Sequence, residues 1–95
     1  MTLKKLHISE SIRDQLEISS KESYELLENL LEIIKRTLVS GEDVMISGFG
    51  KFNVKEKKAR RGRNPATGDN MILDARRVVT FTYSGKLRDK VNGIN

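Results

Sequence analysis

Residues 51–83 read KFNVKEKKARRGRNPATGDNMILDARRVVTFTY. Large apolar side chains alternate with polar ones early in this stretch, at Phe52 and Val54, and again late, at Val79 and Phe81, which is the period of a β-strand. The Asn-Pro-Ala-Thr-Gly-Asp sequence between the two parts has the composition of a tight turn. The stretch therefore predicts two strands that project from the body of the protein as a ribbon.

The segment before this ribbon has the periodicity of helices. Residues 3–16 carry apolar side chains at helical spacing, which predicts a short amphipathic helix. Ser19 followed by Glu22 is a capping-box pattern, and it predicts a second helix that ends at Gly41. The apolar face of that helix is wide, which favours contact with both its own sheet and a partner subunit over the role of an ordinary core helix. The face consists of Tyr24, Leu26, Leu27, Leu30, Leu31, Ile33, Ile34 and Leu38, of which Leu27, Leu31 and Ile34 are expected to lie between subunits.

The remaining elements complete an α+β fold. Val44 and Ile46 predict a strand that turns at Ser-Gly-Phe-Gly, and residues 85–91 predict a last short helix. The predicted order is two helices, a three-stranded antiparallel sheet with a long protruding β-hairpin, and the closing helix. The expected parts of this single domain, residues 1–95, are a helical dimerisation part (1–41), the sheet (42–54 and 78–83), an arm (55–77) and a C-terminal helix and tail (84–95).

Composition limits the class of protein. A chain of 95 residues has room for one domain, and its thin supply of apolar residues, 37%, makes a core shared between two subunits a reasonable expectation. The absence of cysteine excludes disulfides and thiolate chemistry. No signal-peptide or membrane-spanning run is visible, so a soluble intracellular protein is expected. The formal net charge of +5 lies downstream of Ser40 and points to a polyanionic partner.

The positive charge is concentrated in the predicted arm. Residues 55–63 contain six cationic side chains and one acidic side chain, Glu56, and two more arginines follow the turn. Such a density can hold phosphates through counterion release without reading sequence. A solvated charge run or a disordered tail is the alternative, but a tail would not contain a well-formed turn and then resume a strand pattern.

Pro65 is the only proline and lies at the predicted tip, directly after Arg63 and Asn64. Taken alone, a proline at an Asn-Pro-x-x-Gly turn fixes the turn by presetting its φ angle. A rigid apolar ring flanked by a guanidinium and an amide is also the kind of wedge that minor-groove benders insert between base pairs. Because Arg63 and Asn64 precede Pro65, the wedge is favoured over a role in fixing the turn alone.

Three motifs carry a family resemblance. Residues 47–52 (SGFGKF), 62–68 (GRNPATG) and 75–81 (ARRVVTF) resemble, in this order and spacing, the core and arm motifs of the HU and integration host factor family. The similarity spans nearly the whole chain, and the third motif is more similar to the alpha subunit of integration host factor than to HU.

The resemblance implies an architectural protein that bends duplex DNA, in nucleoid organisation, recombination, replication and transcription regulation. Two subunits would intertwine, with one arm from each reaching around the duplex. Pro65 would intercalate, backbone amides near Ser47 would hold flanking phosphates, and three phenylalanines would form a shared core. The implied DNA-binding residues are Lys5, Ser47, Gly48, Lys55, Lys57, Lys58, Arg60, Arg61, Arg63, Asn64, Pro65, Arg76, Arg77 and Lys86.

The resemblance also implies the partners. The expected partners are double-stranded DNA and a second subunit, either a copy of this chain or a beta-type chain, with no membrane, no small-molecule substrate and no cofactor. The expected location is the cytoplasmic nucleoid. An HU-like nonspecific homodimer is the alternative to a site-preferring integration host factor subunit. Two departures stand out: Glu17 is found where many relatives have glycine, so the first turn is expected to differ locally, and Ala66 follows the tip proline in place of a polar or basic residue.

Other functional classes have less support. An enzyme would need an acid–base pair, and the only histidine, His7, lies beside apolar residues in a predicted helix, where a structural role is expected. A membrane-binding arm would carry an apolar face beside its charges. A module for single-stranded RNA would expose aromatic side chains for stacking, whereas the aromatic residues here have core-facing periods.

Overall fold

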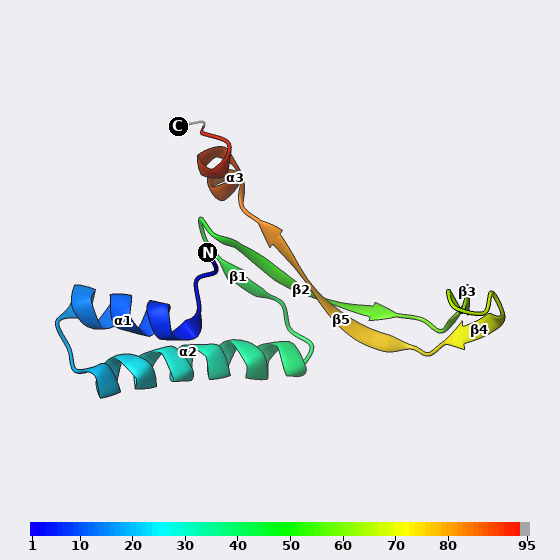
Figure 1. Ribbon diagram of the computed structural model, residues 1–95, viewed down its shortest axis with the longest axis horizontal. Helices are drawn as coiled ribbons and strands as arrows, with labels where there is room; N and C mark the ends of the chain where they lie inside the picture. The colour runs from blue at the N-terminus through cyan, green and yellow to red at the C-terminus, as the bar shows by residue number, and fades with distance from the viewer. Residues whose placement is uncertain (94–95) are drawn as a thin grey trace. The chain divides into compact units, whose positions relative to one another are not determined.

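The computed structural model describes residues 1–93 and divides into two compact units, Met1–Arg36 and Thr37–Asn95. The first unit is a helical hairpin. Helix α1, Lys5–Leu16, runs antiparallel to the first turns of helix α2, Ser20–Val39, which continues into the second unit (Figure 1).

Two serines lie where α1 and α2 approach each other. Ser23 is fully buried and Ser9 nearly so, and the Ser23 hydroxyl donates a hydrogen bond to the backbone carbonyl of Ser9. Small side chains at a helix crossing let the two backbones come close, and the hydrogen bond offsets the cost of burying a hydroxyl. Leu27, 4% exposed, is the one buried hydrophobic residue among those that the structure describes.

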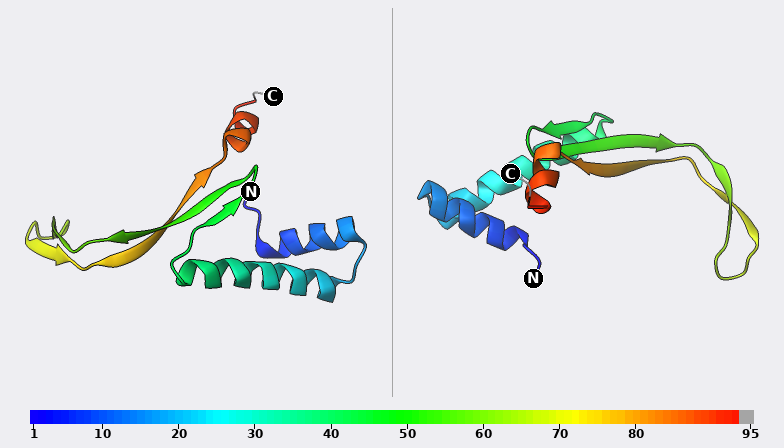
Figure 2. Two further views of the ribbon diagram at one scale, coloured as in Figure 1. Left: turned by 180° about the vertical axis from the view of Figure 1, so that it is seen from behind. Right: turned by 90° about the horizontal axis from the view of Figure 1, so that it is seen from above.

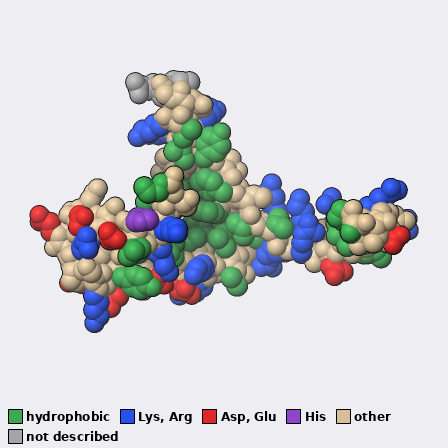
Figure 3. Space-filling model, viewed as in Figure 1, with side chains coloured by type: hydrophobic (Ala, Val, Ile, Leu, Met, Phe, Trp, Pro, Cys, Tyr) green, Lys and Arg blue, Asp and Glu red, His purple; other side chains and the backbone are tan. Residues whose placement is uncertain are grey.

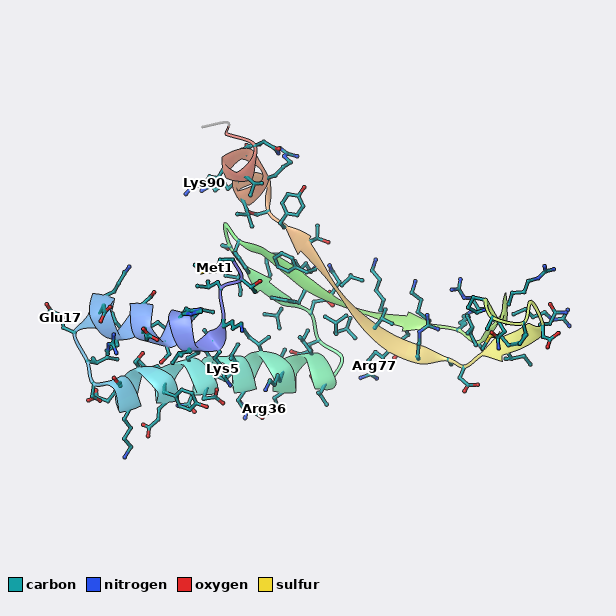
Figure 4. All side chains as sticks on the ribbon, viewed as in Figure 1. Met1, Lys5, Glu17, Arg36, Arg77 and Lys90 are labelled. Atoms are coloured by element: carbon teal, nitrogen blue, oxygen red, sulfur yellow. The ribbon has the colours of Figure 1, made fainter. Side chains whose placement is uncertain are left out.

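Glu17 makes the turn between α1 and α2 in the left-handed conformation, with φ 54° and ψ 46° (Figure 4). The backbone N–H of Ile18 donates to Arg13 O at 3.2 Å, which closes the end of α1. This is the backbone that glycine adopts without steric cost. Glu17 therefore occupies a backbone conformation that suits glycine, at a steric cost to its own side chain; the expected local difference from relatives stays a prediction.

Both ends of α2 agree with the sequence-based prediction. The backbone N–H of Glu22 donates to the Ser19 hydroxyl at 3.1 Å, as in an N-cap. At the other end, Gly41 has φ 96°, its N–H donates to Leu38 O, and the N–H of Glu42 donates to Thr37 O. These two bonds form a Schellman motif, which ends the helix.

The second unit is built on a three-stranded antiparallel sheet in the order β1-β2-β5 (Figure 2). Strand β1 is Val44–Ile46, β2 is Gly50–Lys57 and β5 is Arg76–Tyr83. Phe52 pairs with Phe81, and their ring centroids are 4.8 Å apart. The sheet is therefore joined by an aromatic pair as well as by its backbone ladder.

A separate two-stranded ribbon extends from β2 and β5. Strand β3, Arg60–Arg63, pairs with β4, Asn70–Leu73, and the chain is not paired at residues 58–59 and 74–75. Figure 1 shows this ribbon beyond one end of the sheet and α3, Gly85–Val91, at the other end. The side chain of Ser84 caps α3 by accepting a hydrogen bond from the Leu87 N–H at 3.0 Å.

The predicted order of elements and the protruding hairpin are confirmed, and α3 has the predicted bounds. Two boundaries differ in detail. Helix α1 begins at Lys5 rather than at residue 3, and the β2–β5 ladder continues to the pair Lys57 and Arg76, inside the segment assigned to the arm. The alternation of apolar residues ends before the ladder does, because backbone pairing does not require apolar side chains.

Candidate nucleic-acid interface

The two faces of the sheet differ in chemistry. Paired residues share a face, so Phe52, Val54, Val79, Phe81 and Tyr83 lie together on an apolar face. The opposite face, called here the cationic face, carries mostly polar and basic side chains. Its polar members are Lys51, Asn53, Lys55, Lys57, Arg76, Thr80 and Thr82. A row of four cations along adjacent strands is suited to the spaced negative charges of a phosphate backbone.

Arg76 and Arg77 are both predicted DNA ligands, but they point to opposite faces. Arg76 pairs with Lys57 on the cationic face. Arg77 pairs with Glu56 on the other face, where its guanidinium lies 3.4 Å from the Glu56 carboxylate and donates to the backbone carbonyl of Val39 at 3.0 Å. Figure 4 shows Arg77 beside the segment that follows α2. Only one of the two arginines therefore joins the row of cations.

The β3–β4 ribbon presents its charges to solvent. Arg60, Arg61 and Arg63 are all exposed, and Figure 3 shows Lys and Arg side chains along this part of the molecule. Gly62 interrupts this run of arginines. A larger residue would be crowded there, because a Cβ on Gly62 would lie 3.2 Å from Leu73 Cδ1. The small residue therefore leaves room for the Leu73 side chain against this strand.

The tip is a turn organised by Asn64. Its side-chain oxygen accepts from the Ala66 N–H at 2.9 Å, its carbonyl accepts from the Gly68 N–H at 2.7 Å, and its own N–H donates to Asp69 O at 2.9 Å. Gly68 has φ 76°, a left-handed conformation. Pro65 is exposed at this tip. Because Asn64 makes all of these bonds, the turn does not depend on the proline ring for its closure.

A second group of predicted ligands lies at the end of the sheet away from the ribbon. Ser47 and Gly48 form the exposed β1–β2 turn, in which Gly48 has φ 78°. The Ser84 N–H donates to Phe49 O at 2.9 Å, which joins this turn to the start of α3. Lys86, in the first turn of α3, is exposed. The structure therefore brings Ser47, Gly48 and Lys86 to one end of the sheet and the arm residues to the other.

Lys5 belongs to the first unit and already has a partner there. Its ammonium forms an ion pair with Glu28 and lies 5.7 Å from the ring centroid of Tyr24. The hydrogen bond with Glu28 raises the pKa of Lys5, and the same bond lowers the pKa of Glu28. A phosphate would compete with Glu28 for this ammonium.

Two positions beside the predicted ligands, Lys51 and Asp43, were not singled out by the sequence-based prediction. Lys51 lies on the cationic face, and the alternation of Lys51, Asn53, Lys55 and Lys57 was the signal that could have revealed it. Asp43 accepts a hydrogen bond from the backbone N–H of Val54 at 2.8 Å and lies 3.6 Å from Lys51 Nζ. Nothing in the sequence pattern distinguishes that aspartate from an ordinary loop residue.

Other kinds of site find no support in the part of the chain that the structure describes. Residues 1–93 contain no group of histidine and carboxylate side chains that could hold a metal ion, and none of their helices is long and apolar enough to cross a membrane. His7 is exposed and accepts a hydrogen bond from the Lys4 N–H at 3.1 Å, a contact at the start of α1.

The comparisons with known proteins agree with this geometry. The family model described as bacterial DNA-binding protein matches residues 3–92. The chain belongs to this family, that of HU and integration host factor. It is therefore a DNA-binding architectural protein of the HU and integration host factor type.

Two relatives and one solved structure give the degree of similarity. The chain is 48% identical to integration host factor subunit alpha of Buchnera aphidicola (strain Tuc7) over 92 residues, which cover 97% of the chain and 90% of the relative. It is 46% identical to the same subunit of Escherichia coli O9:H4 over 91 residues, covering 96% and 92%. An HU–DNA cocrystal structure from Anabaena matches with a TM-score of 0.82 and 34% identity over 94% of this chain and 97% of that one.

Proposed function

We propose that the chain binds duplex DNA in the minor groove and bends it by inserting Pro65 at a kink. The observation that carries this proposal is the exposed position of Pro65 at the tip of a cationic ribbon, on a turn closed by Asn64. A wedge must be rigid and apolar, and the turn that carries it must be held in place. The minor-groove benders of this family use such side chains to open a base step.

The proposed contacts fall into three groups. Arg60, Arg63 and Asn64 accompany the wedge into the groove, the cations of the ribbon and the cationic face neutralise phosphates, and the β1–β2 turn with Lys86 holds the flanks. Binding is then dominated by counterion release, with sequence preference coming from DNA deformability. The proposed DNA ligands are Lys5, Ser47, Gly48, Lys55, Lys57, Lys58, Arg60, Arg61, Arg63, Asn64, Pro65, Arg76 and Lys86; the contacts of Arg77 indicate a different role.

The same proposal includes a second subunit. With Leu27 as the one buried hydrophobic residue described, a single chain leaves apolar surface on both units. On α2 the exposed positions are Leu26 at 48%, Leu30 at 52% and Ile33 at 52%, and on the sheet Phe81 is 42% exposed. The residues predicted to lie between subunits are already covered in part, since Leu27 is buried within one chain and Leu31 and Ile34 are half-buried. We therefore assign the contact of α2 with a partner mainly to Leu26, Leu30 and Ile33. Covering these faces requires a partner of the same fold.

The similarity to alpha subunits supports an integration-host-factor-type role, in the cytoplasmic nucleoid and without enzymatic activity, over that of a nonspecific HU-like protein. Native mass spectrometry of the purified chain, alone and with a short nicked duplex, distinguishes the two forms of assembly. A stable dimer of the chain alone supports a homodimer. A monomer that dimerises only with a beta-type chain supports a heterodimer.

The wedge is tested with Pro65→Ala, and Arg63→Ala serves as the comparison. Fluorescence energy transfer between the ends of a bound duplex reports the bend. Pro65→Ala should reduce the bend and the preference for distorted duplexes while retaining the charge and the Asn64 turn, since opening a base step costs a few kcal/mol that the ring no longer offsets. Arg63→Ala should weaken binding to all duplexes. An unchanged bend in the Pro65 variant would show that the proline only shapes its turn.

A further inference from the structure

Carbonyl groups at the C-terminus of α2 accept hydrogen bonds from beyond the helix, and one of the donors comes from the sheet. Thr37 O accepts from the Glu42 N–H, and Leu38 O accepts from the Gly41 N–H. Val39 O would have no partner within the helix, because helices leave their last carbonyl groups unpaired. Arg77, on strand β5, fills that position with a hydrogen bond of 3.0 Å.

The position of Arg77 along its strand matters. It lies one residue from the end of the β2–β5 ladder, whose last pairs are Glu56 with Arg77 and Lys57 with Arg76. Beyond those pairs the chain is unpaired at residues 58–59 and 74–75 and then forms the β3–β4 ribbon. Arg77 therefore contacts the rest of its unit at the point from which the ribbon departs.

A second contact is made to the neighbouring strand β2, at Val54, two residues before the Glu56 that pairs with Arg77. Strand β1 stops at the pair Val44 with Phe52, so the next outward-facing N–H on β2, that of Val54, has no ladder partner. The Asp43 carboxylate accepts from it at 2.8 Å. The last residue of α2, Val39, is thus bonded to β5 through Arg77, and Asp43, in the connection that follows the helix, is bonded to β2.

We propose that Arg77 is a positioning residue that fixes the direction in which the arm leaves the sheet, and that it does not bind phosphate. Its cationic charge lies at the negative end of the α2 dipole and beside Glu56, where both interactions favour a cation. Glu56 is 79% exposed, so that ion pair alone contributes little; the bond to Val39 O is the specific contact. The proposal rests on the proposed function, because a fixed arm direction matters when two ribbons must grip a bent duplex.

The geometry excludes Arg77 from the row of cations in which Arg76 takes part. Neighbouring residues of a strand point to opposite faces. Arg76 shares the cationic face with Lys55 and Lys57, whereas Arg77 shares its face with Val79 and Phe81. A Cβ on Gly41 would be 3.6 Å from Arg77 Nη1, so the guanidinium also lies against the helix-ending glycine.

The test uses Arg77→Lys, Arg77→Ala and the matched neighbour Arg76→Ala. Lysine keeps the charge but lacks the planar fork that reaches Val39 O and Glu56 at once. We expect both Arg77 variants to lower energy transfer between the ends of a bound duplex, with the slope of log affinity against log salt unchanged. Arg76→Ala should reduce the magnitude of that slope by about 1 for each phosphate that the variant no longer neutralises, and it should alter affinity more than bend.

The DNA-free protein provides an independent readout. Amide hydrogen exchange in peptides covering residues 38–44 and 54–58 should be about tenfold faster in Arg77→Ala, as expected when a hydrogen bond to a charged group is removed, and unchanged in Arg76→Ala. Wild-type protein that does not bend DNA would contradict the proposed function, and the exchange experiment would still decide the role of Arg77. Unchanged exchange, or a salt slope that falls in Arg77→Ala as it does in Arg76→Ala, would overturn the positioning role.

Discussion

Gly50 lies against the ring of Phe81, and a Cβ on Gly50 would be 2.5 Å from Phe81 Cζ and 2.7 Å from the carbonyl oxygen of Thr82. Gly50 is the first residue of β2 and pairs with Tyr83, while Phe81 also contacts Phe49 and Phe52, with ring centroids 5.3 Å and 4.8 Å apart. The glycine makes room for the ring at the centre of this aromatic cluster.

Gly50→Ala should therefore destabilise the protein by roughly 1–3 kcal/mol, the range for forcing an extra carbon into a packed site. The nearest atoms include backbone, so the neighbours cannot simply move away. Gly85→Ala is the control, because the nearest atom to its Cβ would be the flexible end of Arg88, 3.9 Å away. Urea unfolding followed by circular dichroism measures both variants, and equal midpoints for Gly50→Ala and wild type would contradict the packing argument.

Glu17→Gly should stabilise the helical hairpin by about 0.5–1 kcal/mol. The left-handed conformation at φ 54° costs a non-glycine residue roughly 1–2 kcal/mol, and part of the gain is offset by the greater freedom of glycine in the unfolded chain. Glu17→Ala separates strain from charge, since it removes the carboxylate but keeps the Cβ. Thermal unfolding should rank glycine above alanine at this position; the reverse order would mean that the turn is not strained.

Acid should weaken the α1–α2 hairpin through Glu28. Its pKa is lowered chiefly by the hydrogen bond to Lys5, so its contribution is present above the unfolded-state pKa and is lost as pH falls through the lower folded-state value. The same bond raises the pKa of Lys5, so the stabilisation that Lys5 contributes is lost only at alkaline pH, as the pH rises through that raised pKa. Glu28→Gln should flatten the decline of stability below a pH of about 4, measured by urea midpoints; an unchanged decline would assign it to other carboxylates.

Leu30→Asp should prevent assembly without unfolding the helix. Leu30 is 52% exposed in a single chain, so a carboxylate there costs little unless a partner subunit covers the site. Asn29→Asp adds the same charge at the adjacent position of α2 and serves as the control. Sedimentation at micromolar concentration, of each chain alone and mixed with a beta-type chain, should show dimers for wild type and Asn29→Asp but not for Leu30→Asp. A wild-type chain that stays a folded monomer both alone and in the mixture would refute the shared core.

Affinity for duplex DNA should fall steeply with salt. If a dimer neutralises about 6 to 10 phosphates, log affinity against log salt should have a slope of roughly −5 to −9. Arg63→Ala should make that slope less steep, because it removes a charge from the ribbon. Titration of a labelled duplex at several salt concentrations measures it. An affinity nearly independent of salt would mean that the ribbon is not the binding surface.

The features that could be predicted from the sequence depend on local chemistry. Alternation predicted β2 and β5, Ser19 and Gly41 marked the ends of α2, and the Asn-Pro-x-x-Gly sequence marked the tip. These features depend on backbone preferences within a few residues, so one chain is enough to reveal them.

The features that could not be predicted depend on tertiary register. Adjacent positions place Arg76 and Arg77 on opposite faces, but the pairing with β2 decides which face carries the lysines. The bond between Asp43 and Val54 exists because β1 stops two residues earlier in the ladder, and no local pattern indicates that stop. The burial of Leu27 within one chain likewise depends on how α1 and α2 meet, whereas periodicity places Leu27 and Leu30 on a common broad face.

Strand β1 is short and pairs with only the first residues of β2, which has a consequence for solubility. Past Val54, strand β2 has no neighbour on its outer side among the described residues, and unpaired strand edges are templates for edge-to-edge association with other chains. The exposed side chains next to that open edge include Lys55, Lys57 and Lys58, and like charges on an approaching copy repel it. The cations proposed to hold DNA therefore also protect the free protein from aggregation, and substitutions that remove several of them would endanger solubility before any effect on DNA could be measured.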